Sequence, residues 1–408
     1  MRVAYVCADR GVPVFGRKGC SVHVQEVIRA LIAHGARVDL IAARLGGSAP
    51  EDFRQVRVHT LPAELERAGT VAHEHACVRA NIAVRRALDA LGPLDLVYER
   101  YSLWSFAAMR WAQRSRIPGL LEVNAPLVDE QAAHRVLCDR DTAMRIAGRN
   151  FSTAHAVIAV SRQVAEWVQS FPTTEGRVHV IPNGVDPSRF KPAAHDRGFE
   201  GNGRNEDLFT IGFVGTLKAW HGLPLLVDAF SELHAEHRRT RLVIVGDGPE
   251  GAALEERLRA RNLQSAAVLT GAMDPRAIPT LLASMDVAVA PYSAKQPFYF
   301  SPLKVLEYMA AGLPVVASRV GQLEELIADR VNGLLYEPDD PRALAACVRR
   351  LRDSPELRQR LGAAARSAVE ARYTWDVVIE RSVTLAGLAL PSSSAPASDS
   401  LRGREVHA

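Results

Sequence analysis

Residues 300–318 read Phe-Ser-Pro-Leu-Lys-Val-Leu-Glu-Tyr-Met-Ala-Ala-Gly-Leu-Pro-Val-Val-Ala-Ser, and this order predicts a loop, a helix and a buried strand. Ser301 is expected to cap the helix, and Pro302 is expected to occupy its first position. Gly312 suits the residue after a helix, and Pro314 opens an apolar strand. A helix that begins in this way presents free N–H groups and the positive end of its dipole to an anion.

Two charged side chains of this helix extend the pattern. Lys304 adds a positive charge near the helix start, and Glu307 lies one turn further on, where it can accept hydrogen bonds from ribose hydroxyls. Phosphate at the helix start and a sugar one turn along describe a site for a nucleoside diphosphate. The local pattern fits an ordinary capped helix between two loops equally well, so the rest of the chain has to decide.

The composition is that of an ordinary globular protein. A chain of 408 residues is expected to form two domains, and 48% hydrophobic with 24% charged residues is in the usual range. The formal net charge of +4 is too small to indicate nucleic-acid binding, although it allows weak attraction to an anionic membrane surface. No apolar run reaches the ~20 residues of a membrane span, and the chain enters a strand at Val3 without a signal peptide. A cytoplasmic protein is expected, with contact at the inner face of the membrane left open.

Neither a metal site nor a disulfide framework is predicted. The five cysteines are scattered and odd in number, without a Cys-x-x-Cys pair, and the 13 histidines form no ligand pattern. Asp139 and Asp141 superficially resemble a metal-binding pair, but they fall in an amphipathic helical stretch and are expected to form a solvated face. The sequence therefore predicts no metal and no cofactor.

Short apolar strands alternate with amphipathic helices along the chain. Helical patterns include 21–34, 71–91, 103–115, 161–169 and 223–234. Runs rich in Val, Ile and Leu predict strands at 2–8, 37–43, 56–61, 94–101, 119–124, 155–160, 178–182, 208–214, 241–246, 266–270, 286–290, 314–318 and 333–336. This alternation predicts the α/β class, with two doubly wound Rossmann-like domains that face each other across a cleft.

The domain boundaries follow from local composition. The first domain is expected to span 1–190 and the second 208–370, because the polar, Gly-rich residues 191–207 lack periodicity and are typical of a linker. Residues 371–390 are expected to form a helix that packs back towards the first domain. Residues 391–408 are rich in Ser, Ala and Pro, which is typical of a disordered tail.

A Gly-rich loop with Gly16 and Gly19 follows the first strand, and Ser21 is expected to cap the next helix. The loop is neither Gly-x-Gly-x-x-Gly nor a phosphate loop of the Gly-Lys-Ser/Thr type. The second strand is followed by Arg44, where an acidic residue would indicate NAD binding. Either the glycines allow a tight turn, or they let the loop approach a ligand.

In the second domain, small and polar residues follow the strand ends. Gly215 would let a ligand approach, and Lys218 and His221 lie in the loop behind it. A lysine there can hold a diphosphate as a compact charge, and Lys304 follows another strand end of the same domain. Gly246 ends a strand within Gly-Asp-Gly-Pro. The alternatives are a solvated lysine and a simple Gly-Pro turn.

Polar residues also end two strands of the first domain. Glu99 and Arg100 end one strand, and Glu122 and Asn124 end another. They lie where an acceptor molecule could bind beyond the sheet. The carboxylates could equally be paired with Arg100 in a structural role.

A set of motifs occurs in a characteristic order along residues 1–385. They are the Gly16/Gly19 loop with Ser21-Val22-His23, Ile181-Pro182-Asn183-Gly184-Val185-Asp186, Phe213-Val214-Gly215, Val245-Gly246-Asp247-Gly248-Pro249, residues 306–318 and Asn332-Gly333-Leu334-Leu335. In this order they resemble the nucleotide-sugar glycosyltransferases of the GT-B fold, in the large retaining group called glycosyltransferase family 4.

The resemblance implies a donor site in the second domain and an acceptor site mainly in the first. Glu307 matches the glutamate that binds the donor ribose, and Lys304 with the backbone after Ser301 matches the diphosphate site. Gly16 and Gly19 match the loop that closes over the donor. With the strand-end residues above, the predicted donor-binding set is Gly16, Gly19, Gly215, Thr216, Gly246, Ser301, Pro302, Leu303 and Glu307.

Two departures from the family pattern matter. The family often has a second glutamate eight residues before the ribose one, and Tyr299 stands there. It also often has an Arg and a Lys after the first strand of the second domain. Those positions hold Thr216 and His221, with Lys218 between them. This resembles a subgroup whose donor loop reads Ser-Pro-Leu-Lys, in which Lys218 and Lys304 are the natural phosphate clamps.

The implied reaction is a retaining transfer of a sugar from a nucleoside-diphosphate donor to an acceptor hydroxyl, in glycan, glycolipid or polysaccharide biosynthesis. No enzymic nucleophile is evident, so the resemblance suggests front-face attack in which a leaving-group oxygen takes the acceptor proton. Lys218 and Lys304 are expected to stabilise the leaving diphosphate, and His23 or Glu99 to orient the acceptor. The predicted catalytic residues are Lys218, Lys304 and His23, and the predicted acceptor-side residues are Glu99, Arg100 and Asn124.

Two other functions stay open. A non-catalytic partner subunit would keep the fold without the chemistry, and Tyr299 in place of a glutamate keeps this alternative open. An NADP-dependent oxidoreductase would use Arg44 for the ribose phosphate, but the dinucleotide fingerprint is missing.

The acceptor is not identified, and both a lipid-linked substrate and a glycan fit. Arginines near an apolar stretch would favour a lipid-linked substrate, although the solvated basic face of an amphipathic helix is the better interpretation. The residues concerned are Arg110, Arg114 and Arg116, with Leu103, Trp104 and Phe106.

Overall fold

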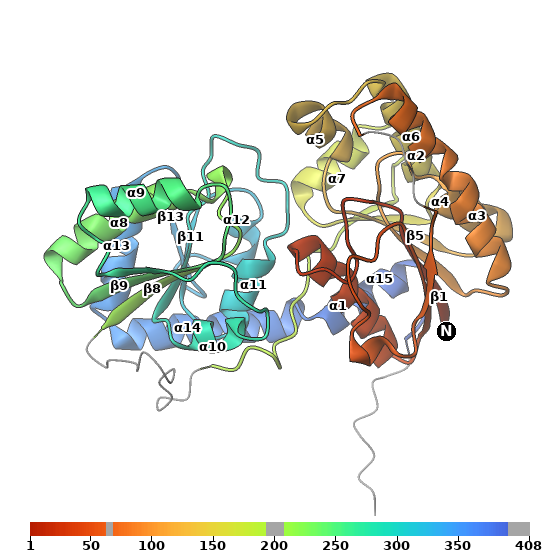
Figure 1. The fold of residues 1–408 in the computed structure, drawn as a ribbon. Coiled ribbons are helices and arrows are strands. Elements are labelled where there is room, and N and C mark those ends of the chain that lie inside the picture. Colours follow the sequence, from red (N-terminus) through yellow and green to blue (C-terminus); the bar gives the residue numbers. More distant parts are fainter. Residues whose placement is uncertain (63–67, 193–207, 391–408) are drawn as a thin grey trace, which may run out of the picture.

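Two α/β domains lie side by side in the structure, a computed structural model that describes residues 1–62, 68–192 and 208–390 (Figure 1). Each domain has one parallel sheet with helices on both faces. The predicted α/β class with two doubly wound sheets is therefore confirmed. Most of the predicted linker, residues 193–207, and the whole predicted tail, residues 391–408, lie outside the described residues.

The first sheet has seven parallel strands in the order β3-β2-β1-β4-β5-β6-β7. Val3 to Cys7 of the central strand are fully buried, because helices cover both faces of the sheet. The strand bounds are β1 Arg2–Cys7, β2 Arg37–Ala42, β3 Arg57–Thr60, β4 Leu96–Arg100, β5 Gly119–Val123, β6 Ala156–Ala159 and β7 Val178–Val180.

The helices of the first domain form two layers. Apolar side chains of α1 pack on one face of the sheet, and those of α3, α4, α6 and α7 pack on the other. The bounds are α1 Gly19–Ala33, the 3-10 helix η1 Glu51–Phe53, α2 Val71–Arg79, α3 Asn81–Ala90, α4 Ala107–Ser115, α5 Leu127–His134, α6 Arg140–Thr153 and α7 Arg162–Gln169.

The second sheet has six parallel strands in the order β10-β9-β8-β11-β12-β13. The strands are β8 Phe209–Val214, β9 Thr240–Val245, β10 Ala267–Leu269, β11 Val287–Ala290, β12 Val315–Ser318 and β13 Leu334–Tyr336. The helices of this half are η2 Ala219–His221, α8 Leu223–Glu236, α9 Gly251–Ala260, α10 Ile278–Ala283, α11 Leu303–Ala310, α12 Leu323–Leu326, α13 Pro341–Arg352 and α14 Pro355–Arg372, followed by α15 Trp375–Leu385.

Each sheet has one point at which the strand order reverses. This point lies between β1 and β4 in the first sheet and between β8 and β11 in the second. Ligands of open parallel sheets bind beyond the carboxyl ends of the strands at such points. The loops that leave these four strands therefore decide where the site lies.

The chain passes between the two domains twice, and the two crossings lie together. Val185, which follows β7, forms a parallel bridge with Thr374. Beyond this bridge, α15 packs against α1 (Figure 1). Trp375, Ile379 and Val383 thereby join the apolar cluster on one face of the first sheet.

Two predicted helices differ from the observed ones. The stretch 71–91 forms α2 and α3, which meet at Ala80, rather than one helix. Asn81, the first residue of α3, binds the start of α4, since its Oδ1 accepts from the N–H groups of Phe106 and Ala107, each at 2.9 Å. The predicted helix 103–115 begins only at Ala107. The residues before it form a loop in which Trp104 has a φ of 74°.

The expectation for Asp139 was also wrong. This residue lies just before α6 rather than within a helix, and its Oδ1 accepts from the N–H group of Thr142 at 2.9 Å. Asp139 is therefore the N-cap of α6, as a short carboxylate at that position should be. Asp141 is exposed in the first turn of the same helix.

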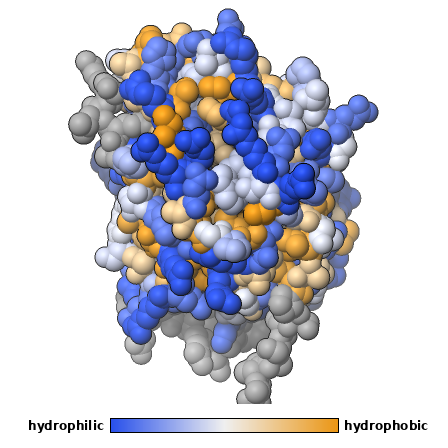
Figure 2. Space-filling view, turned by 90° about the vertical axis from the view of Figure 1, so that its right-hand side faces the viewer, coloured by the Kyte–Doolittle hydropathy of each residue, from blue (hydrophilic) through white to orange (hydrophobic). Residues whose placement is uncertain are grey.

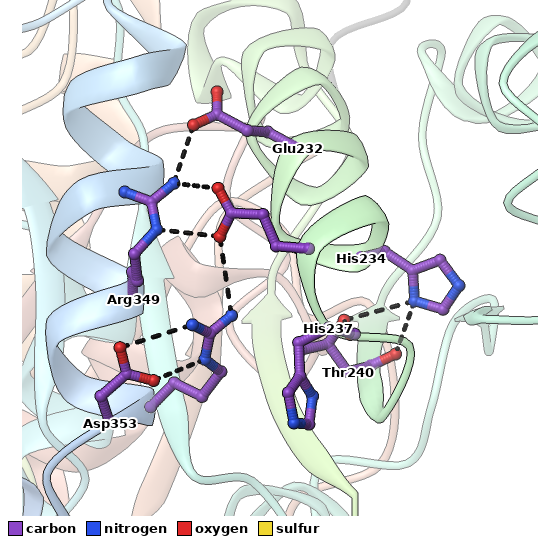
Figure 3. Close-up of polar contacts among 8 residues, drawn as sticks. Glu232, His234, His237, Thr240, Arg349 and Asp353 are labelled. Atoms are coloured by element: carbon purple, nitrogen blue, oxygen red, sulfur yellow. Dashed lines mark hydrogen bonds and ion pairs between the residues drawn. The ribbon is translucent and has the colours of Figure 1, made fainter.

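Figure 3 shows ion pairs that join α8 to α13 in the second domain. Arg349 donates to Glu232 at 2.8 Å and to Glu236 at 2.6 and 2.9 Å. The three side chains are about one-third exposed, so each pair contributes little to stability. Glu232 and Glu236 lie near the carboxyl end of α8, whereas His221 precedes its amino end.

The end of the first domain that lies on the right in Figure 1 carries hydrophilic side chains interspersed with smaller hydrophobic areas (Figure 2). Arg110, Arg114 and Arg116 are exposed on or just after α4, whereas Trp104 and Met109 are buried. α4 thus has a solvated basic face above an apolar one. Within the described ranges, no helix is both long enough and apolar enough to cross a bilayer.

Candidate active site

The helix within residues 300–318 begins one residue later than predicted. α11 starts at Leu303, and Pro302 occupies the N-cap position without a side-chain cap. The Ser301 hydroxyl does not cap the helix, because it accepts from the N–H group of Asn183 at 3.1 Å. The Asn183 side chain also donates to the Ser301 carbonyl at 3.2 Å. Asn183 therefore fixes the loop in front of α11.

The first residues of α1 and α11 lie next to each other, one from each domain (Figure 1). A Cβ atom on Gly19 would lie 4.0 Å from Cδ1 of Leu303, and Leu303 packs against the apolar cluster that includes α1. α1 starts at Gly19, so Ser21 lies within its first turn and is not its cap. Two helix N-termini with their free N–H groups are thus brought together, which favours an anion between the domains.

Lys304 is half-buried against aromatic rings at this junction. Its ammonium lies 4.3 Å from the ring centroid of Phe213 and 5.5 Å from that of Tyr292. Its Nζ donates to Nε2 of His221 at 3.1 Å. A Cβ atom on Gly215 would lie 2.5 Å from the same Nζ. A side chain at position 215 would displace this ammonium group, and Gly215 has a φ of 150°, which residues with side chains rarely adopt.

His221 holds Lys304 as a neutral acceptor. Its Nδ1 lies 2.5 Å from the carbonyl of Thr216, so Nδ1 carries the proton and Nε2 is free to accept from Lys304. Burial and the nearby Lys304 charge lower the pKa of His221 to about 3. The imidazole therefore stays uncharged beside the ammonium. The sequence placed His221 in this loop but did not predict this role.

The surroundings of α11 disfavour the charged forms of both Lys304 and Glu307. Burial lowers the pKa of Lys304 to about 7, and the nearby Glu307 carboxylate opposes this shift. Burial raises the pKa of Glu307 to about 7, against the pull of Arg189 and Lys304. Arg189 itself pairs with Glu26 of α1 at 2.9 Å. Glu26 and Arg189 are therefore neighbours of the candidate ribose site that the sequence did not predict.

Lys218 lies at the edge of the same cluster. It precedes η2, and its ammonium lies 5.6 Å from the ring centroid of the exposed Trp220. It also contributes, after burial and Lys304, to lowering the pKa of His221. The structure thus brings Lys218 and Lys304 together around one imidazole.

The other predicted glycines are explained by packing within the chain. A Cβ atom on Gly246 would lie 2.0 Å from the carbonyl oxygen of Gly215. A Cβ atom on Gly16 would lie 2.9 Å from the carbonyl oxygen of Pro13, to which the Gly16 N–H group donates at 2.7 Å. For both residues the tight-turn alternative is therefore sufficient, whereas Gly19 faces the second domain.

A second polar cluster lies at the ends of β4 and β5 in the first domain. Nε2 of His23 lies 2.6 Å from Glu122, and Arg100 donates to Nδ1 of His23 at 3.1 Å. Tyr98 and Asn124 donate to the same carboxylate at 2.9 and 3.0 Å. Burial alone would raise the pKa of Glu122, but His23 and Arg100 outweigh it and lower this pKa to about 2.

Glu122, which was not among the predicted site residues, is the centre of this cluster. It is opposite Arg100 in the register of β4 and β5, and the Arg100 charge favours the Glu122 carboxylate, in agreement with the structural alternative that the sequence left open. Both ring nitrogens of His23 are occupied, and its ring packs against Trp375 with centroids 5.3 Å apart. His23, Arg100 and Asn124 are thus brought together, but through contacts within the chain.

The structure separates Glu99 from this group. Successive residues of a strand point to opposite faces, so Glu99 lies on the other face of the sheet from Arg100. Glu99 is fully buried, and Ser105 donates to its carboxylate. Burial raises the pKa of Glu99 to about 7. Its partner Ser105 lines a cavity of the first domain, so Glu99 lies behind that cavity and apart from the cluster around Glu122.

A cavity of about 520 Å³ opens in the first domain beyond the carboxyl ends of β1 to β4. Its wall includes Arg10, Asn81, Trp104, Glu130 and Arg135. Trp104 therefore faces this cavity and is not exposed beside α4. Since the cavity lies at the ligand-binding edge of the sheet, it is the best candidate for an acceptor site.

Two family models match the chain. Residues 17–189 match the model described as Glycosyltransferase Family 4, and residues 209–354 match the model described as Glycosyl transferases group 1. The two matches together cover most of the sequence, one in each domain. They favour the glycosyltransferase interpretation over an oxidoreductase.

Similar proteins cover nearly the whole chain. An uncharacterized glycosyltransferase of Methanocaldococcus jannaschii is 27% identical over 402 residues, which is 96% of this chain and 99% of that protein. A D-inositol 3-phosphate glycosyltransferase of Thermomonospora curvata is 28% identical over 396 residues, with 89% of each chain covered.

Solved structures share the fold. Sucrose-phosphate synthase from Thermosynechococcus elongatus superposes with a TM-score of 0.74 at 22% identity, covering 94% of this chain and 98% of that one. HepE of Anabaena, in complex with UDP, gives a TM-score of 0.73 at 20% identity, with 95% and 100% covered. These matches confirm the GT-B arrangement of the two domains.

Proposed function

Because the chain belongs to glycosyltransferase family 4 and has the GT-B fold, we propose that it transfers a sugar from a nucleoside-diphosphate donor to an acceptor hydroxyl with retention at C1. The observation that carries the proposal is the surroundings of the Lys304 ammonium. The half-buried side chain of Lys304 places the ammonium beside a neutral imidazole, at the meeting point of two helix N-termini. A diphosphate would supply the missing negative charge.

The proposed reaction exchanges one bond at C1 for another. The bond from C1 to the diphosphate oxygen breaks, and a bond from C1 to the acceptor oxygen forms on the same face of the sugar. The acceptor proton passes to a departing diphosphate oxygen. Lys304, Lys218 and the start of α11 stabilise the charge that develops on this leaving group. Glu307, one turn along, accepts from the ribose hydroxyls.

UDP is the first nucleotide to test, because the similar protein HepE was solved in complex with UDP. Thermal-shift and calorimetric titrations with UDP, GDP, ADP and TDP should show stabilisation by one of them. Binding of none of the four would overturn the donor-site assignment. Hydrolysis of the matching nucleotide sugar without an acceptor would then exclude a non-catalytic partner subunit.

The proposal assigns charge neutralisation to lysines and helix N-termini, without a metal ion. We therefore expect donor hydrolysis to proceed at an unchanged rate in excess EDTA. A rate that falls in EDTA and returns with added Mg²⁺ or Mn²⁺ would contradict this part of the proposal.

A further inference from the structure

Tyr299 belongs to the loop after β11, but its ring lies in the first domain. Its neighbours Phe298 and Phe300 pack against the apolar cluster of the second domain. Tyr299, between them, packs against the cluster formed by α3, α4, α6 and α7 of the first domain. This alternation is that of an extended segment, and it makes Tyr299 a contact between the domains.

Both the side chain and the backbone of Tyr299 are bound by the first domain. The Tyr299 hydroxyl donates to the Glu130 carboxylate of α5, and the Ser161 hydroxyl donates to the Tyr299 carbonyl. Ser161 also caps α7, because its side chain accepts from the N–H group of Val164 at 3.2 Å. Close by, Gln322 of the second domain donates to the carbonyl of Val160 at 2.6 Å.

The partner of Tyr299 lies in the wall of the first-domain cavity. Glu130 is one of the residues that line the cavity of about 520 Å³. Tyr299 is only two residues before Ser301, which Asn183 binds, and four before Leu303, where α11 begins. One short segment therefore connects the candidate diphosphate site to a carboxylate in the cavity.

In the hydrogen bond between Tyr299 and Glu130, the Tyr299 hydroxyl can act only as the donor. Burial and the Glu130 charge raise the pKa of Tyr299, so its hydroxyl keeps its proton at neutral pH. The helix that carries Glu130 is anchored separately, since the Asp129 side chain accepts from Trp167 at 2.7 Å and from Arg140 at 2.8 Å. What Tyr299 fixes is the position of the Glu130 carboxylate.

We propose that Tyr299 is a positioning residue that couples nucleotide binding at the start of α11 to the Glu130 carboxylate in the first-domain cavity. The inference rests on the proposed function and deepens it. A diphosphate that orders residues 301–303 also orders Tyr299, which then holds Glu130 in one position towards the acceptor. By reciprocity, an occupant of the cavity that binds Glu130 strengthens nucleotide binding.

Hydrogen exchange of the full chain, with and without saturating UDP, tests the coupling. In the native protein, UDP should slow exchange in α11 and also in α5, although α5 belongs to the other domain. In Tyr299→Phe, which keeps the ring, the slowing in α11 should persist and that in α5 should be lost. The expected loss is about tenfold in the exchange rates of α5, because a hydrogen bond to a charged group is removed.

Two further variants keep the test decisive. Glu130→Ala should lose the same UDP-dependent slowing in α5 even if Tyr299→Phe folds poorly. Asp129→Asn is the matched control on the same helix, and it should change the baseline exchange of α5 but keep the UDP effect.

The outcomes separate this inference from the proposed function. If UDP slows exchange in neither helix of the native protein, and GDP, ADP and TDP give the same result, nucleotide binding itself is refuted, and the coupling with it. If UDP slows α11 alone in the native protein, or slows α5 equally in Tyr299→Phe, the donor site stands and the coupling is refuted.

Discussion

The polar cluster around Glu122 and the polar cluster around Lys304 differ in whether their buried charges have partners of opposite charge. In the first domain, Glu122 is surrounded by His23, Arg100 and Tyr98, and its pKa is lowered to about 2. In the second, Lys304 and Glu307 lie one turn apart, and burial moves the pKa of both to about 7. The first cluster is satisfied within the chain, whereas the second is short of favourable partners.

This difference separates a buried charge that is paired within the chain from a buried charge that has a neutral neighbour. A buried charge with full partners stabilises the folded state only as long as every partner is present. A buried charge with a neutral neighbour such as His221 is costly until an opposite charge arrives. His23 and Lys304 were both predicted as catalytic, but their surroundings differ: both ring nitrogens of His23 are bound within the chain, whereas Lys304 donates to a neutral imidazole.

The largest expected effect is the loss of stability when Glu122 is removed from the polar cluster of the first domain. Glu122→Ala leaves Arg100 and His23 without their carboxylate, so the free energy of unfolding should fall by about 3–5 kcal/mol. Urea unfolding at pH 7 measures this loss. Glu232→Ala in the exposed network of Figure 3 is the control and should cost about 1 kcal/mol or less. Equal losses in the two variants would show that Glu122 is not a structural centre.

The same variant should also change acid unfolding. An unfolded glutamate titrates near 4.5, and the pKa of Glu122 in the folded chain is about 2. Glu122 therefore contributes about 3 kcal/mol to the free energy of unfolding above about pH 5. This contribution is lost as the pH falls towards 2. The native protein should lose stability steeply over this interval, and Glu122→Ala should lose less.

The next largest effect is expected from a substitution of Lys304 in the second domain. Lys304→Met keeps much of the side-chain volume but removes the ammonium, so donor turnover should fall by about 10²–10³-fold, or about 3–4 kcal/mol. Stability should stay equal or rise, because a desolvated charge is removed. Donor hydrolysis and thermal unfolding of the same preparation measure both. Normal turnover with an intact fold would remove Lys304 from the site.

The smallest effect is the pH dependence of nucleotide binding. The pKa of Lys304 is about 7 in the free protein, and a bound diphosphate favours the ammonium and raises it. Above pH 7 binding must take up a proton, so UDP affinity should fall by up to tenfold per pH unit, about 1.4 kcal/mol. Calorimetry in two buffers of different ionisation enthalpy detects the proton. Lys304→Met should bind weakly with no such slope, and a flat profile in the native protein would contradict the assignment.

Much of the fold could be predicted because its signals are local. Runs such as 37–43 and 286–290 are apolar over strand length and lie between helical patterns, so the alternation can be read directly. The helix caps could not be predicted in the same way. The Ser301 hydroxyl accepts from Asn183, which lies 118 positions earlier, and the Asn81 side chain binds the N–H group of Phe106, 25 positions later. Such contacts exist only after the chain has folded.

The candidate site was predicted only in part, for a similar reason. Lys304 and Lys218 follow strand ends in recognisable motifs, so their neighbourhood could be inferred. The separation of Glu99 from Arg100 had a signal in the sequence, because the two residues are consecutive in a strand and must point to opposite faces. The contact of Tyr299 with Glu130 spans 169 positions and has no local signature.

The packing of α15 on α1 has a consequence for the nascent chain. The first domain leaves the ribosome early, but Trp375, Ile379 and Val383 belong to the apolar cluster on one of its faces. At 5–20 residues per second, synthesis from residue 190 to residue 375 takes roughly 10–40 s. During that interval α1 lacks its cover and offers apolar surface to chaperones or to neighbouring chains. The domain that is synthesised first is therefore completed last, and its solubility during translation depends on how fast the second half is made.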